Sequence, residues 1–203
     1  MCADFKPTAL SLVLAAALWV LVFLTRPFDF WLMLGGSTFI LLVVSVLISS
    51  KRLALHTTVS FVLYGVLSAV MLYALFRVGY DFTKSIPIFS QGVGQVYGLK
   101  SSQPAWVIVL LLIFPIGPGE EIYWRGLVQR AFAEKTSPNI SLLAASICYA
   151  LVHLPTFNPP LIMTALIGGL VWGSLYKWTH SLVPGIVSHV LWDLMIFVLI
   201  PLV

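Results

Sequence analysis

Residues 117–126 read Gly-Pro-Gly-Glu-Glu-Ile-Tyr-Trp-Arg-Gly, and they lie inside an apolar run at 105–133. This stretch places two carboxylates and a guanidinium, those of Glu120, Glu121 and Arg125, among side chains that suit lipid. A charge near the centre of a bilayer costs at least about 2.5 to 3.5 kcal/mol on insertion scales, so ionisable residues in a spanning segment indicate a functional site. The stretch therefore predicts a membrane-embedded fold and the place of its site.

The composition excludes an ordinary soluble domain. Of the 203 residues, 60% are hydrophobic and 9% are charged, whereas soluble domains carry about 25% charged residues. The mean hydropathy is +1.03. The net charge of +4 comes from basic residues scattered singly between apolar runs, so we expect the lipid bilayer with its anionic headgroups, and not nucleic acid, as their partner. Cys2 and Cys148 are too few for a disulfide framework. We expect an integral, multi-pass membrane protein.

Apolar runs between charged or Pro- and Gly-rich breaks predict about seven transmembrane helices, because a helical span needs about 17 to 25 apolar residues. The runs are 8–25, 30–50, 57–80, 105–133, 141–154, 161–178 and 182–203, and the basic pair at 51–52 closes the second. The segment 81–104 is too polar and broken to span, and we expect an interfacial loop or a short surface helix there. Pro115 and Gly117-Pro118-Gly119 are expected to kink or break the helix of the fourth run and to start a new one just before Glu120.

These runs predict an all-α fold, a polytopic membrane helix bundle with a catalytic cavity near the midplane of the membrane. Residues 1–104 would supply the N-terminal transmembrane helices and the interfacial connector. Residues 105–203 would supply the core helices that carry the chemistry. We expect the two parts to form one integral membrane unit.

Ionisable groups from three predicted spans reach similar depths. At about 1.5 Å rise per residue, Glu120, His153 and Asp193 lie roughly 16 to 21 Å below one face, and His189 lies about 10 Å below it. Charges in a membrane must face the bundle interior and find each other or water. We therefore expect these four side chains to line the predicted cavity.

Spacing separates the roles within each helix, since residues four apart share a face and adjacent ones point about 100° apart. Glu121 and Arg125 are four apart and are expected to form an ion pair that supports the site. Glu120 then points elsewhere, toward the cavity, and we expect it to be aimed at His153 and His189. His189 and Asp193 are also four apart, and they either belong to the site or form a hydrogen bond that only holds the last helix in place.

Two kinds of chemistry suit these groups. Without a metal, Glu120 is the general base toward a water, His153 helps to orient that water, and His189 donates to the developing oxyanion. With a metal, Glu120, His153, His189 and Asp193 would hold a divalent ion such as zinc, because two imidazoles and a carboxylate form a known catalytic set. The chain lacks the H-E-x-x-H pattern of zinc helices. The residues alone leave both readings open.

Three short motifs follow one another along the second half of the chain. They are Glu120-Glu121-x-x-x-Arg125, Tyr149-x-x-x-His153 and His189-x-x-x-Asp193. Their order and content resemble the signature of the CPBP family, which contains the CAAX prenyl endopeptidases and the bacterial bacteriocin-processing and self-immunity proteins, also called the Abi family. The resemblance covers roughly residues 117–197.

The resemblance implies an intramembrane endopeptidase in which Glu120 activates water, His153 assists it, and His189 with Asp193 forms the oxyanion site. Such enzymes have been described both as metalloproteases and as glutamate-dependent. Asp193 stands where Asn is common in the family's eukaryotic enzymes, and an ionised carboxylate only accepts hydrogen bonds, so orienting His189 or binding a metal suits it better. Tyr149 stands where Phe is common and adds a hydroxyl, and we place it with the residues that support the site.

The expected substrate is a hydrophobic or lipidated peptide, a prenylated C-terminus or a peptide precursor, in a bacterial plasma membrane. An alternative is a non-catalytic membrane protein for bacteriocin self-immunity or scaffolding, which keeps the same residues for structure or partner binding. A third is an ion or proton pathway, which also uses carboxylates at the midplane but gives no reason for two convergent histidines.

Overall fold

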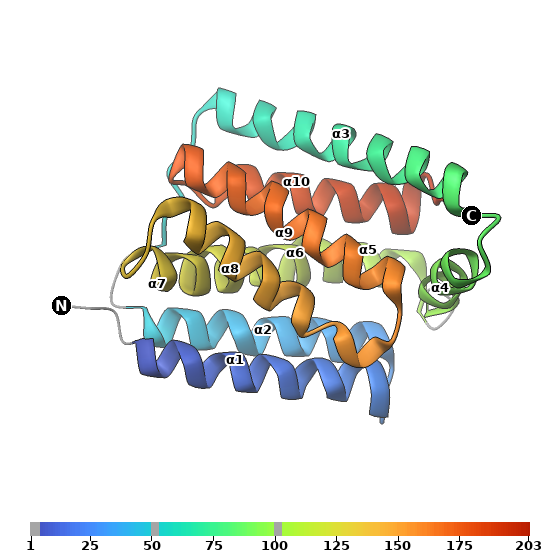
Figure 1. Cartoon of the computed structure of the whole chain (residues 1–203), viewed down its shortest axis with the longest axis horizontal. Coiled ribbons are helices and arrows are strands. Elements are labelled where there is room, and N and C mark those ends of the chain that lie inside the picture. Colours follow the sequence, from blue (N-terminus) through green and yellow to red (C-terminus); the bar gives the residue numbers. More distant parts are fainter. Residues whose placement is uncertain (1–4, 50–52, 100–102) are drawn as a thin grey trace.

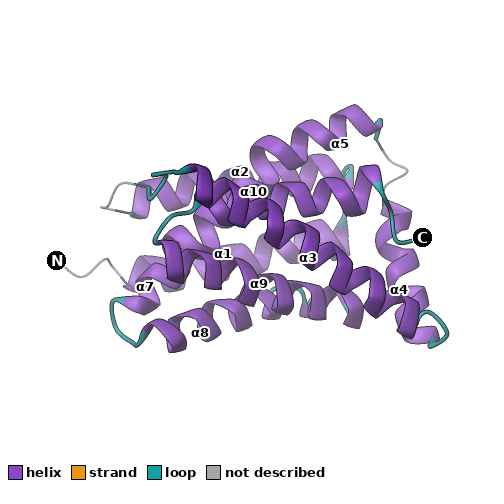
Figure 2. Cartoon of the chain, turned by 90° about the horizontal axis from the view of Figure 1, so that it is seen from above, coloured by secondary structure: helices purple, strands orange, loops and turns teal. Residues whose placement is uncertain are grey.

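A computed structural model describes residues 5–49, 53–99 and 103–203. Cys2, the predicted end of the second span at Ser50 and the basic pair after it lie outside the described residues. Over the described ranges every regular element is a helix and no strand occurs (Figure 2). The all-α prediction is therefore confirmed.

Four α-helices precede residue 100. They are α1 (Phe5–Val20), which continues as the π-helical turn η1 (Leu21–Thr25), α2 (Phe30–Ile48), α3 (Val59–Thr83) and α4 (Pro87–Gly98). After residue 102 one long helix is made of α5 (Ala105–Leu111), η3 (Leu112–Ile116), α6 (Gly117–Glu121), η4 (Ile122–Gln129) and α7 (Arg130–Ala133). The chain ends with α8 (Pro138–Leu151), the 3-10 turn η5 (Leu154–Thr156), α9 (Pro159–Thr179), α10 (Val183–Leu194) and η6 (Met195–Leu199).

Six of these helical runs are long and apolar enough to cross a membrane. They are Lys6–Thr25, Phe30–Ile48, Val59–Thr83, Ala105–Ala133, Pro138–Thr156 and Pro159–Thr179, and the apolar run Val183–Leu199 is shorter. Their outer faces carry exposed apolar side chains, for example Leu67 and Met71 on α3, as contact with lipid requires. The protein is therefore an integral multi-pass membrane protein, with one helix for each of the seven predicted runs.

Several helix starts follow directly from side chains that cap them. Asp29, Thr58, Ser137 and Asn158 each accept a hydrogen bond from the backbone N–H three residues later, at the first turns of α2, α3, α8 and α9. Such caps satisfy one of the free N–H groups at a helix start. The breaks between the apolar runs thus contain or adjoin the polar residues that cap the helices that follow them.

The predicted break at Pro115 and Gly117-Pro118-Gly119 is wrong. The helix runs without interruption from Ala105 to Ala133, and Pro115 lies inside the π-helical turn η3. A proline lacks the N–H and crowds the carbonyl four residues earlier, and a π-helical turn changes that hydrogen-bond pattern. Ile116 keeps helical dihedral angles and makes no side-chain cap, so Glu120 lies within a continuous helix and not at a helix start.

The glycines beside Pro118 serve close packing. A Cβ atom on Gly119 would lie 2.9 Å from the carbonyl oxygen of Thr38 on α2, and one on Gly117 would lie 2.6 Å from Val190 on α10. Such distances are closer than ordinary side-chain contacts, so only glycine lets these helices approach. In Figure 1 the α6 segment accordingly lies inside the bundle, between α2 and α10. This packing sets Glu120 in the protein interior.

The predicted surface segment 81–104 contains the helix α4. It lies at the end of the bundle next to the C-terminal residues (Figure 1) and contacts α9. The amide of Asn158, which precedes α9, donates to the carbonyl of Gly92 over 2.8 Å. A Cβ on Gly92 would lie 2.9 Å from the Asn158 side-chain oxygen, so the glycine permits this contact. α4 therefore covers one end of the space between the long helices.

Helices from both halves of the chain share one core. Trp19 on α1, Leu72 on α3, Trp124 on η4 and Trp172 on α9 are nearly or fully buried in the same cluster. α3 runs along α10 (Figure 1). The N-terminal helices therefore supply walls to the site that the C-terminal motifs form.

Candidate active site

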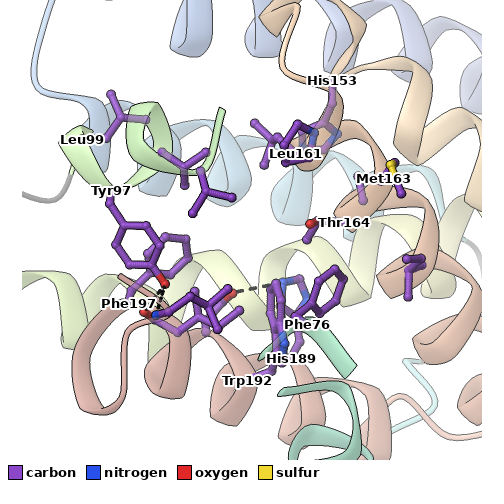
Figure 3. A pocket seen from close by; sticks show the side chains of 18 of the residues that line it. Phe76, Tyr97, Leu99, His153, Leu161, Met163, Thr164, His189, Trp192 and Phe197 are labelled. Atoms are coloured by element: carbon purple, nitrogen blue, oxygen red, sulfur yellow. Dashed lines mark hydrogen bonds and ion pairs between the residues drawn. The ribbon is translucent and has the colours of Figure 1, made fainter. Parts of the chain in front are cut away.

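A cavity of about 290 Å³ lies between the helices, and mostly apolar side chains line it. Five of the predicted site residues line this cavity, namely Glu120, Tyr149, His153, His189 and Asp193. Figure 3 shows His153 on one wall and His189 with Trp192 on the wall across from it. The structure thus brings the residues of all three motifs to one space.

Glu120 is only 5% exposed, and its two carboxylate oxygens have different surroundings. The hydroxyl of Tyr149 donates to Oε2 over 2.5 Å, the short distance of a charge-assisted bond. Among the described residues no hydrogen bond reaches the other oxygen, Oε1. Tyr149 therefore fixes the orientation of this carboxylate and leaves Oε1 without a protein donor.

Glu121 lies behind the cavity and forms the predicted pair with Arg125. Arg125 Nη1 donates to Glu121 Oε1 over 2.9 Å, with both side chains nearly fully buried. Arg125 Nη2 also donates to the carbonyl oxygens of Gly168 and Gly169, at 3.4 and 3.2 Å. The guanidinium is thus satisfied by α9 as well as by Glu121.

His189 has a partner that was not predicted. The imidazole Nδ1 donates to Glu121 Oε1 over 2.9 Å, whereas Glu121 was expected to pair with Arg125 alone. The α6 and α10 segments pack directly on each other, and Gly185 leaves room for the Glu121 carboxylate, since a Cβ there would lie 2.8 Å from Oε2. Glu121 therefore links the first motif to the third.

The other nitrogen of His189 faces Asp193. The distance from Nε2 to Asp193 Oδ2 is 3.6 Å, longer than an ordinary hydrogen bond. Trp172 stacks on the imidazole with ring centres 3.8 Å apart and planes 12° apart. Trp172 is held in turn, because its Nε1 donates to Ser188 Oγ over 3.1 Å. This stacking and the bond to Glu121 fix the plane of the His189 ring.

His153 has a hydrogen-bond partner on each ring nitrogen. Nδ1 lies 2.7 Å from the backbone carbonyl of Tyr149, and Nε2 accepts from the indole N–H of Trp19 over 3.0 Å. His153 and Glu120 face the same cavity and both contact Tyr149, but no direct hydrogen bond joins them in the described structure. Glu120 was expected to point at His153. The two side chains instead lie on the same cavity without a direct hydrogen bond between them.

The four residues proposed as metal ligands do not form a metal site in this arrangement. Over the described ranges no three His, Cys, Asp or Glu side chains are grouped so that they could hold a metal ion. The lone pair that His153 would offer is occupied by Trp19, and Glu120 Oε2 is occupied by Tyr149. Metal binding through His153 Nε2 would need its bond to Trp19 to break, and Glu120 could offer only Oε1 while Tyr149 holds Oε2.

Two aromatic residues of the site were not predicted. Trp19 lies on α1 and Trp172 on α9, and each contacts a candidate catalytic imidazole. A tryptophan in an apolar span reads as core or as an interfacial anchor, so no signal in the sequence singles them out. Their role depends on which helices meet, which only the folded arrangement determines.

The end of the cavity near α4 is closed by the last residues of the chain. The Tyr97 hydroxyl donates to the carbonyl of Ile196 over 3.0 Å and accepts from the backbone N–H of Leu202 over 2.9 Å. Burial raises the pKa of this hydroxyl, so it remains a donor at neutral pH. Tyr97, Leu202 and Phe197 all line the cavity, and Figure 3 shows Tyr97 next to Phe197.

The fold and the site define a polytopic membrane protein with carboxylates and imidazoles gathered around a buried cavity. Residues 101–195 match the family described as Rce1-like, Type II CAAX prenyl endopeptidase Rce1-like. Residues 101–195 are therefore similar to the CAAX protease family, as the three motifs predicted. No curated protein and no solved structure matches the chain. α1, α2 and α3 lie outside the matched segment.

Proposed function

We propose that this protein is an intramembrane endopeptidase that cleaves a peptide bond with a water activated by Glu120. One observation carries the proposal: the buried Glu120 carboxylate lines a cavity with one oxygen held by Tyr149 and the other without a donor among the described residues. The match of residues 101–195 to a family of CAAX prenyl endopeptidases agrees with this function.

In the proposed reaction Glu120 Oε1 takes a proton from a water, and the water oxygen attacks the carbonyl carbon of the scissile bond. A tetrahedral intermediate forms, with negative charge on the former carbonyl oxygen. The protonated Glu120 then gives its proton to the leaving nitrogen as the C–N bond breaks. The water thus supplies the hydroxyl of the new carboxyl group and a proton of the new amine.

His189 is the proposed donor to the oxyanion. Its ring plane is fixed by Trp172 and Glu121, and its Nε2 lies at the cavity, 3.6 Å from Asp193. An imidazole that donates on both sides carries a positive charge, which stabilises a negative oxygen in a site without bulk water. Asp193, if ionised, can only accept hydrogen bonds, so its proposed role is to orient His189.

The proposed substrate is a hydrophobic or lipidated peptide. Aromatic and aliphatic side chains supply most of the cavity wall, among them Phe30, Leu34, Phe76 and Leu112. Such a wall favours an apolar group that arrives from the membrane, because contact between apolar surfaces is more favourable than contact of either surface with water. The polar groups of the site lie on the same cavity, so a peptide bond next to the apolar group would reach Glu120.

The test is a cleavage assay with the purified protein in lipid vesicles. Prenylated and unprenylated forms of the same C-terminal peptide are supplied, with and without a chelator, and the products are identified by mass spectrometry. We expect cleavage at one defined bond that persists in the presence of chelator. Intact peptides under all conditions would refute the proteolytic function, and loss of cleavage on chelation would refute the metal-free mechanism.

Replacing Tyr149 by Phe is expected to lower kcat about tenfold and to leave KM unchanged. The change removes only the hydroxyl that holds Glu120 Oε2, and the loss of one charge-assisted hydrogen bond is worth about 1.5 kcal/mol or more. The matched control is Tyr123→Phe, whose hydroxyl lies 3.2 Å from Ser11 Oγ in the core and should not affect turnover. An unchanged kcat for Tyr149→Phe would show that the hydroxyl does not position the base.

A further inference from the structure

Trp19 is a buried residue of α1 that reaches the site from outside the three motifs. Its side chain has no exposed surface, lines the cavity, and donates its indole N–H to Nε2 of His153 over 3.0 Å. The two rings meet edge to face, with centres 5.7 Å apart. The residue lies outside the segment 101–195 that matches the protease family.

The partners of His153 determine which nitrogen carries its lone pair. A neutral imidazole has one N–H and one lone pair. Nδ1 faces the carbonyl oxygen of Tyr149 at 2.7 Å, and a carbonyl only accepts hydrogen bonds, so Nδ1 carries the hydrogen. The lone pair therefore lies on Nε2, where the indole of Trp19 occupies it. While this bond is made, His153 can neither hold a water nor receive a proton.

Contacts other than the one with Trp19 also hold the imidazole of His153. Its Nδ1–H remains bonded to Tyr149, whose ring meets it edge to face at 5.1 Å, and Phe23 packs on it with ring centres 5.8 Å apart. The bond to Trp19 is thus not needed to orient the ring. Its direct effect is to occupy the nitrogen that would act on a water.

We propose that Trp19 masks Nε2 of His153 in the resting protein and releases it when water and peptide enter the cavity. The effect on turnover rests on the proposed function, with His153 in the role that the family resemblance implies, assistance to the water that Glu120 activates. Masking itself is a property of the resting protein. Masking and its effect on turnover can therefore be measured separately.

The masking is tested by chemical modification of His153 in detergent-solubilised protein. Diethyl pyrocarbonate attacks an unprotonated imidazole nitrogen, and the modified peptide is measured by mass spectrometry. We expect Trp19→Phe to be modified at His153 about fivefold faster than the wild type, the factor that one ordinary net hydrogen bond sets. Trp124→Phe is the matched control, because Trp124 is equally buried and its indole N–H has no partner within the described chain. Equal rates in all three proteins would overturn the proposal.

The effect on turnover is tested with the same variants in the cleavage assay. We expect Trp19→Phe to raise kcat/KM about fivefold through a lower KM, because the bond to His153 no longer has to break when the peptide binds, and Trp124→Phe to match the wild type. A lower or unchanged kcat/KM in Trp19→Phe would overturn the role in turnover. If the wild-type protein cleaves no peptide, the proposed function fails, while the modification rates still decide whether Trp19 masks His153.

A measurement on the wild-type protein covers the case in which Trp19→Phe does not fold. In nitrogen-15-labelled protein a hydrogen bond between two nitrogens gives a coupling across the bond. We expect this coupling between Trp19 Nε1 and His153 Nε2 in the protein without substrate, and its loss when a non-cleavable peptide analogue is bound. An absent coupling in the free protein, or one that persists in the complex, would overturn the proposal.

Discussion

Replacing Glu120 by Gln is expected to lower kcat/KM for peptide cleavage on the order of 10³-fold, within the range that one general base supplies. The glutamine amide has the size of the carboxylate and its oxygen can still accept from Tyr149. Its nitrogen cannot take a proton from water. The variant therefore loses the general base but keeps the buried hydrogen bond to Tyr149. The cleavage rate in lipid vesicles measures the effect.

The control for this variant is Glu134→Gln, which changes an exposed carboxylate after α7 and should leave cleavage unchanged. Melting curves in detergent should show that both variants stay folded. Full cleavage activity in Glu120→Gln would exclude Glu120 as the base. If the protein protects cells against a bacteriocin and the variant protects equally well, the immunity or scaffold alternative is favoured. If the variant instead loses ion uptake into vesicles, the pathway alternative is favoured.

The spans and the Glu121–Arg125 pair could be predicted because both depend on local sequence. Span length follows from the bilayer thickness, and two residues four apart on a helix meet whatever surrounds them. The pair is present at 2.9 Å. The convergence of Glu120, His153 and His189 on one cavity followed from their depths, because polar groups in a membrane avoid lipid.

The contacts between helices could not be predicted from spacing. The angle between Glu120 and Glu121 on a helix is known from the sequence, but the direction in which α10 lies is not. The π-helical turns η3 and η4 flank α6 and change the regular angular step on which such reasoning depends. The bond from His189 to Glu121 was missed for this reason.

The glycines near Pro118 illustrate the same limit. Gly and Pro signal a helix break in water, and that rule predicted a helix start before Glu120. In this bundle Gly119 is instead the point of closest approach to α2, and Pro115 is accommodated by a π-helical turn. Inside a membrane a broken helix leaves polar backbone groups unpaired, so continuity is favoured and small residues serve helix packing.

Replacing Arg125 by Met is expected to lower the free energy of unfolding by about 3 to 5 kcal/mol, the cost of removing one partner of a buried ion pair. The carboxylate of Glu121 is 1% exposed, and its Oε2 already has no hydrogen-bond partner within the described chain. Without Arg125 only His189 would donate to it. The carbonyls of Gly168 and Gly169 would also lose their donor. Unfolding in detergent with increasing denaturant measures the loss.

The double variant Glu121→Gln with Arg125→Met separates charge from packing. It removes both charges, keeps an oxygen that can accept from His189, and should be more stable than Arg125→Met alone, because no uncompensated carboxylate remains buried. Coupling of this kind is expected for residues in direct contact. If the double variant were as unstable as the single one, the stability from Arg125 would come from its stacking on Tyr149 and Trp172, at 5.3 and 5.4 Å, and from the two carbonyls. Recovery of stability in the double variant would instead show that Arg125 is needed because the charge of Glu121 is buried. The carboxylate that holds His189 would then also be the group that makes the protein depend on Arg125 for its stability.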